Sequence, residues 1–154
     1  MPKVPGTVTF RFHGGDEVYR VKSATLSVKR TEEGAELFFY VRTDKGTIGP
    51  PREDYLATAP NAEVLVCVDD FDPDGLVGQT FRVPVSYDAV RKDHVAAFYY
   101  HEHDDLSDNV VEIISRGRKK VHVRWTAKAH RVETYGMDNT TPVVIDAWFE
   151  FADD

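Results

Sequence analysis

Two short stretches of this 154-residue chain combine side chains that bind metals or move protons. The first is VDDFDPDG, residues 68–75, in which Asp70, Asp72 and Asp74 occupy alternate positions ahead of a glycine. Alternating aspartates followed by glycine open the calcium loop of helix–loop–helix proteins. The stretch therefore raises the hypothesis of a calcium site with Asp70, Asp72 and Asp74 as ligands.

The same stretch also has the composition of a tight turn. A calcium loop of that type closes with a bidentate glutamate at its twelfth position, and counting from Asp70 that position is Phe81. The sequence Asp72, Pro73, Asp74, Gly75 has aspartate first, proline second and glycine fourth, as type I turns prefer. A plain turn between two strands is the favoured interpretation, and calcium binding is the alternative.

The second stretch is His-Glu-His at residues 101–103. Residues two apart in a strand point to the same side and lie about 7 Å apart, so His101 and His103 are predicted to direct their imidazoles at one point. Two histidines with a carboxylate suit zinc or non-haem iron, and Asp108 is one candidate among several for the third ligand. The alternative is a strand end whose exposed histidines pair with carboxylates.

Aromatic residues offer a third kind of site. The chain has 9 phenylalanines, 7 tyrosines and 2 tryptophans, enough either to fill a core or to line a cavity. Tyr99, Trp125 and Trp148 are the candidates for a ligand-binding cavity.

The elements that position these residues are predicted to be strands. Apolar and polar residues alternate with period two throughout the chain, and turn signals recur every 10–15 residues or so. About nine or ten strands in one domain, residues 1–154, indicate an all-β fold. We expect an antiparallel β-sandwich, because several strands are apolar on both faces, and a closed β-barrel is the alternative.

Three further segments carry specific expectations. Cys67 lies in the apolar run VLVCV and is predicted to be a core residue. Residues 110–114, VVEII, are predicted to need cover on both faces, from the chain itself or from a partner. The basic run RGRKK at residues 116–120 is predicted to be a solvated hairpin turn, with contact to an anion or an acidic partner as the alternative.

Composition limits the function. The net charge of −7 argues against nucleic-acid binding, and no apolar run approaches the length of roughly 18 residues that spans a membrane. A lone cysteine and an N-terminus without signal-peptide features favour a cytoplasmic protein.

No nucleophile-elbow, phosphate-loop, dinucleotide or C-x-x-C motif is present in the sequence. The expected function is therefore a non-catalytic binding or interaction module with a protein partner. The alternatives are a metal-binding barrel or metal-dependent enzyme at His101 and His103, and a small-ligand carrier.

Overall fold

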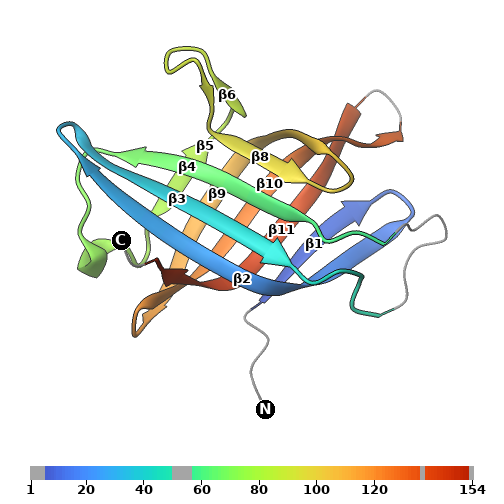
Figure 1. Ribbon diagram of the computed structural model, residues 1–154, viewed down its shortest axis with the longest axis horizontal. Helices are drawn as coiled ribbons and strands as arrows, with labels where there is room; N and C mark the ends of the chain where they lie inside the picture. Colours follow the sequence, from blue (N-terminus) through green and yellow to red (C-terminus); the bar gives the residue numbers. More distant parts are fainter. Residues whose placement is uncertain (1–5, 50–56, 136–137, 153–154) are drawn as a thin grey trace.

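The computed structural model describes residues 6–49, 57–135 and 138–152. Its strands are β1 (Gly6–Phe12), β2 (Gly15–Thr31), β3 (Gly34–Thr43), β4 (Asn61–Val68), β5 (Thr80–Val83), β6 (Tyr87–Asp88), β7 (Asp93–His94), β8 (Ala96–Tyr99), β9 (His103–Gly117), β10 (Lys120–Tyr135) and β11 (Asp138–Phe151) (Figure 1). The one helix in the described ranges is the single 3-10 turn η1 (Pro73–Gly75). Accordingly, these residues contain no helix of the length and apolarity that a bilayer crossing requires.

The strands form a closed barrel. The sheet order is β10-β11-β1-β2-β3-β4-β8-β9, and β9 pairs with β10 again, which closes eight antiparallel strands into a ring. The all-β prediction is confirmed, the sandwich is wrong, and the barrel alternative is the one observed. Apolar residues on both faces of β3 and β4 suggested a second layer. Instead, the outward Phe38, Tyr40 and Leu65 remain half-buried on the outer surface of the barrel.

The interior follows directly from the period-two pattern. In β10 the residues Val121, Val123, Trp125, Ala127 and Ala129 are buried, while the residues between them are half-buried or exposed. An eight-stranded barrel is just wide enough for side chains to fill it. Among the largest fully buried side chains are Trp125, Tyr19, Phe10, Phe39 and Phe149. This barrel is therefore packed through its centre.

One position in the ring is shared by two short strands. On β9, β5 pairs with residues from Glu112 to Asn109 and β8 pairs with residues from Asp105 to His103. Residues 84–95 leave the barrel between β5 and β8 and carry the small β6–β7 hairpin, which projects from the wall (Figure 1).

The segment VVEII lies within β9, beside β5. Val111 and Ile113 face the core, and Ile113 is only 1% exposed, so the inner face is covered by the chain itself. On the outer face, Ile114 is exposed. Ile113 is thus a core residue and no part of an interaction surface.

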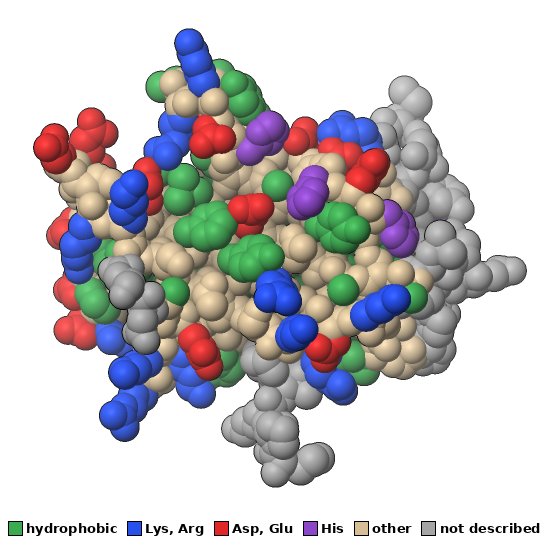
Figure 2. Space-filling view, in the orientation of Figure 1, with side chains coloured by type: hydrophobic (Ala, Val, Ile, Leu, Met, Phe, Trp, Pro, Cys, Tyr) green, Lys and Arg blue, Asp and Glu red, His purple; other side chains and the backbone are tan. Residues whose placement is uncertain are grey.

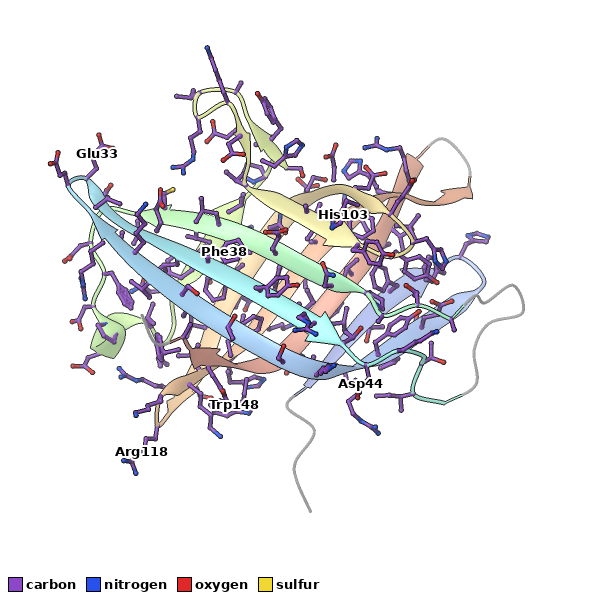
Figure 3. The ribbon with its side chains drawn as sticks, in the orientation of Figure 1. Glu33, Phe38, Asp44, His103, Arg118 and Trp148 are labelled. Atoms are coloured by element: carbon purple, nitrogen blue, oxygen red, sulfur yellow. The ribbon has the colours of Figure 1, made fainter. Side chains whose placement is uncertain are left out.

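The barrel has two differently built ends. One end, called here the mouth, carries the β2–β3 and β9–β10 hairpins and the loop from β4 to β5 (Figure 1). The other, called here the closed end, carries the β1–β2 turn and the β8–β9 turn. Glu33 and Arg118 mark the mouth in Figure 3, and Asp44 and His103 lie toward the closed end.

Candidate functional site

The aspartate stretch lies in the loop from β4 to β5, which covers the mouth of the barrel and is called here the plug. Asp72 precedes η1, and its Oδ1 accepts a hydrogen bond from the backbone N–H of Asp74 at 3.0 Å, as a helix cap does. This turn places Phe71 and Leu76 in the core, where they are 7% and 2% exposed. The predicted turn is therefore present, and its role is to hold two apolar side chains across the barrel end.

The predicted calcium ligands face outward from the plug. Asp70, Asp72 and Asp74 are exposed, and Asp74 forms an ion pair with Arg116 at 3.0 Å. Within the described ranges, no three His, Cys, Asp or Glu side chains converge in a way that would hold a metal ion. Calcium binding at this turn remains a prediction without support from the geometry.

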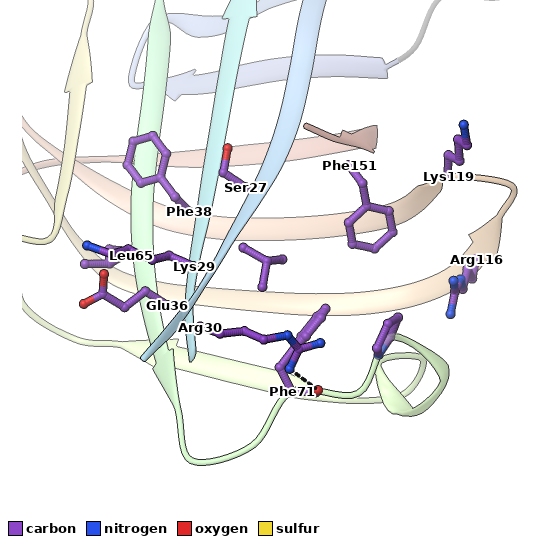
Figure 4. A pocket seen from close by; sticks show the side chains of 12 residues that line it. Ser27, Lys29, Arg30, Glu36, Phe38, Leu65, Phe71, Arg116, Lys119 and Phe151 are labelled. Atoms are coloured by element: carbon purple, nitrogen blue, oxygen red, sulfur yellow. Dashed lines mark hydrogen bonds between the residues drawn. The ribbon is translucent and has the colours of Figure 1, made fainter. Parts of the chain in front are cut away.

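A large hollow lies beside the plug. It has a volume of about 1010 Å³ and is lined by the last third of β2, by the outer face of β3 and β4, by the plug, and by the β9–β10 hairpin (Figure 4). Both Lys29 and Arg30 line it, although neighbouring residues of a strand point to opposite faces. The hollow therefore wraps around the edge of β2 that faces away from β3.

The edge of β2 is open there because of the register. Among the described residues, 27–31 pair with β3 alone, and β11 contacts β2 as far as Leu26, whose carbonyl accepts from the N–H of Ala152 at 3.0 Å. Beyond Leu26 a gap separates β2 from the β9–β10 hairpin, and Phe151, the ladder partner of Leu26, lines its start. Figure 4 shows Phe151, Lys119 and Arg116 on one side of the β2–β3 hairpin, with Phe38 and Leu65 on the other.

The inner part of the hollow alternates cations with aromatic rings. The Arg30 guanidinium lies 5.3 Å from the ring centre of Phe71 and donates a hydrogen bond to the Phe71 carbonyl at 3.2 Å. The Arg116 guanidinium lies 6.0 Å from the ring centre of Phe151. Both arrangements are favourable cation–π contacts that also hold the two rings in place.

The charge of the hollow is positive. Its lining includes four cations, Lys29, Arg30, Arg116 and Lys119. Glu36 is the one acidic residue of the described lining, and it is paired with Arg91 at 3.0 Å. In the described part of the chain, no carboxylate pairs with the ammonium group of Lys29 or of Lys119. The hollow thus combines apolar walls with uncompensated positive charge.

The part of the hollow that lies over the outer face of β3 and β4 continues onto the barrel wall. Figure 2 shows hydrophobic side chains gathered near the centre of this face, over β3 and β4, within a rim of charged residues. Phe38 and Tyr40 are stacked there with ring centres 6.3 Å apart.

The closed end holds a buried carboxyl group. Glu17 is 1% exposed, and its Oε1 accepts hydrogen bonds from the hydroxyls of Tyr19 at 2.6 Å and Tyr100 at 2.5 Å. Burial, together with the hydrogen bonds to Glu17 and Tyr100, raises the pKa of Tyr19 far above its ordinary value. Tyr19 therefore stays neutral and keeps its proton for Glu17.

A small hollow of about 210 Å³ lies at this end and is lined by Tyr100, His101, Asp104, His130 and Arg131 among others. Arg131 binds Asp104 and also pairs with Asp105 at 3.1 Å. Burial alone would raise the pKa of Asp104, but hydrogen bonds from Arg131 and from the backbone N–H of Asp105 outweigh it and lower that pKa below its ordinary value.

The two histidines predicted to share a metal lie in different settings. β8 ends at Tyr99 and β9 begins at His103, so His101 belongs to the turn between them and the strand rule does not apply to it. The ring centres of His101 and Tyr100 are 4.5 Å apart, and those of His103 and Tyr99 are 5.1 Å apart. Asp108 pairs with Lys128 at 3.3 Å. Zinc or iron binding by these residues stays a prediction that no convergence of side chains supports.

The three predicted cavity aromatics do not meet. Trp125 is fully buried in the barrel, and its Nε1 donates to Asn109 Oδ1 at 2.9 Å. Trp148 lies on the outer wall, stacked on His122 with ring centres 5.2 Å apart, and Tyr99 lies outside against His103. The aromatic residues that do line a large hollow are Phe38, Phe71 and Phe151.

Two segments near the mouth carried predictions, one of which is wrong and one of which is confirmed. Cys67, predicted to be core, is exposed on the outer face of β4, where Arg91 lies 3.5 Å from its sulfur. The alternation of β4 puts Val64 and Val66 inward and therefore turns Cys67 outward. The basic run at residues 116–120 does form the β9–β10 hairpin turn, as predicted, and supplies two of the cations of the hollow.

Comparison with known proteins gave no match to any family model, curated protein or solved structure.

Proposed function

We propose that this protein binds a small amphipathic organic anion at the mouth of its barrel. The observation that carries the proposal is one large hollow that combines aromatic walls with two lysines that have no carboxylate partner among the described residues, in a chain of net charge −7. Ligand sites in barrels occur preferentially at the mouth and pair apolar walls with a few placed polar groups.

The aromatic and the basic residues of the hollow have different roles in this proposal. Phe71 and Phe151 offer ring faces to an apolar body, and each is held by an arginine. Lys29 and Lys119 stand at the rim and attract a carboxylate, sulfate or phosphate head group. Burial of the apolar body at about 25 cal/mol per Å² supplies most of the affinity, and the exposed lysines contribute about 0.2–1 kcal/mol each.

Calorimetric titration with three compounds tests this proposal. Decanoate has both an apolar chain and an anionic head, decyltrimethylammonium has the same chain with a cationic head, and acetate has the head alone. We expect decanoate to bind about tenfold or more tightly than decyltrimethylammonium, and acetate to give no heat. Equal binding of the two long-chain compounds would reduce the site to a nonspecific apolar surface and refute the proposal.

A second candidate is protein interaction through the projecting segment 84–95. It is supported by the exposure of Val85, Tyr87 and Val90, at 50%, 48% and 93% of their surface, in this one segment. Sedimentation velocity over a range of concentrations, with and without Val90→Asp, tests whether this hairpin mediates self-association. Identical sedimentation of both proteins at all concentrations would remove that interpretation.

A further inference from the structure

A serine and a histidine are in hydrogen-bond contact at the closed end, away from the mouth. The Oγ of Ser107 on β9 lies 2.7 Å from Nε2 of His130 on β10, and both side chains are half-buried. This distance is within the range in which a histidine acts as general base toward a hydroxyl. In the tautomer with the proton on Nδ1, the Ser107 hydroxyl donates to Nε2.

The backbone beside each of the two residues is irregular. The described non-glycine residues with positive φ are Lys92, Asp108, Lys119 and Arg131, and the first and third of them lie in hairpin turns. The other two directly follow the pair: Asp108, at φ 49°, follows Ser107, and Arg131, at φ 60°, follows His130. The ladders of β10 also shift register near both residues. Such bulges and left-handed residues redirect side chains and are concentrated at functional sites.

An acidic group and a cavity complete the arrangement. His130 lines the hollow of about 210 Å³ together with Asp104. The carboxylate of Asp104, on the same hollow as His130, is fixed by Arg131 and by the N–H of Asp105. A fixed negative charge near the ring stabilises the imidazolium that forms when the histidine takes a proton.

We propose that Ser107 is a nucleophile activated by His130, and that the hollow lined by His130 takes the acyl group of a small carboxylic ester. The Ser107 oxygen attacks the ester carbonyl carbon while its proton passes to His130 Nε2. The bond to the alcohol oxygen breaks, and the departing alcohol takes that proton. Water then attacks the acyl-Ser107 ester, gives its proton to Nε2, and the proton returns to Ser107 as the carboxylic acid leaves.

The same two strands contain a matched control pair. Ser115 on β9 and His122 on β10 are direct partners in the same ladder, whereas Ser107 pairs with Lys128 and reaches His130 diagonally. His122 Nε2, however, is bound to Asp146 Oδ1 at 2.5 Å, and the described contacts include no hydrogen bond between Ser115 and His122. Substitutions at this pair control for loss of any serine or histidine from the barrel wall.

The test is labelling of the full chain with a fluorophosphonate, followed by intact-mass measurement and peptide mapping. We expect one adduct, on Ser107. Ser107→Ala should abolish labelling, and His130→Gln should slow it about 100-fold, as loss of a general base does. Ser115→Ala and His122→Gln should label at the parent rate, and circular dichroism of every variant shows which of them fold.

Hydrolysis of p-nitrophenyl acetate by the same set of proteins gives a second reading that does not require a stable adduct. The proposal is overturned if the folded parent protein forms no adduct on Ser107 and hydrolyses the ester no faster than Ser107→Ala. It is equally overturned if His130→Gln reacts at the parent rate, because His130 would then not activate Ser107.

Discussion

The two ends of the barrel differ in whether their polar groups have hydrogen-bond or ion-pair partners among the described residues. At the closed end, Glu17 is enclosed and its oxygen is shared by two tyrosine hydroxyls, while Asp104 is bound by Arg131. At the mouth, Lys29 and Lys119 are exposed beside aromatic rings. In the described part of the chain, no carboxylate forms an ion pair with either lysine. Satisfied groups stabilise a fold, whereas groups left unsatisfied next to an apolar hollow are available to a ligand.

The contrast predicts its largest effect at Glu17. Glu17→Ala should lower the free energy of unfolding by about 4 kcal/mol, because it leaves the hydroxyls of Tyr19 and Tyr100 buried without their acceptor. Urea denaturation measures the change, and Glu17→Gln, which keeps one acceptor oxygen, should cost less. Lys29→Ala at the mouth should change stability by no more than about 0.5 kcal/mol. Similar losses for Glu17→Ala and Lys29→Ala would break the comparison.

The plug of the mouth is the next largest contribution. Phe71→Ala should cost about 3 kcal/mol, since a buried ring is removed, and should also weaken decanoate binding because a wall of the hollow is lost. Val77→Ala, in the same loop but with 48% of its surface exposed, is the control and should leave both quantities nearly unchanged. If Phe71→Ala unfolds in urea like the parent protein, the loop does not plug the barrel.

Removing the rim charges should alter binding more than stability. The double change Lys29→Gln and Lys119→Gln should weaken decanoate binding about tenfold, a loss of about 1.4 kcal/mol, and should reduce its dependence on salt. Lys22→Gln with Lys45→Gln, which lie at a different small hollow, is the matched control. Calorimetry of both pairs checks the prediction, and an equal loss in the control would mean that net charge alone attracts the ligand.

The smallest expected effect is on acid stability. The pKa of Asp104 is lower in the folded protein than its ordinary value of 3.8, so its stabilising contribution is complete above that pH and is lost as the pH falls through the folded value. Asp104→Asn should therefore flatten the fall of the melting temperature below about pH 4. A fall as steep in Asp104→Asn as in the parent protein would assign acid unfolding to other carboxylates.

Much of the fold could be predicted from the sequence because alternation is a local property. Val121, Val123 and Trp125 could be assigned to one face of a strand from their spacing alone. Closure could not be predicted, since it depends on β1 pairing with β11, two strands at opposite ends of the described chain. Sandwich and barrel use the same alternation, so the pattern did not distinguish them.

The sites were harder to predict for a related reason. His101 and His103 are two residues apart, but a turn between Tyr99 and His103 separates their surroundings. Conversely, Arg30 and Phe71 meet across 41 positions of sequence, and no spacing rule connects them. Ser107 and His130 meet only because of the register of two strands and the bulges within them.

The most direct test of the account is to map where an amphipathic anion binds. Titration of the nitrogen-15-labelled protein with decanoate, followed by amide chemical shifts, reports on both ends of the barrel at once. We predict the largest shifts at Val28, Arg30, Phe71, Lys119 and Phe151, with those of Glu17, Tyr19 and Tyr100 unchanged. Shifts concentrated at the closed end, or spread evenly over the barrel surface, would contradict the assignment of the mouth as the binding site.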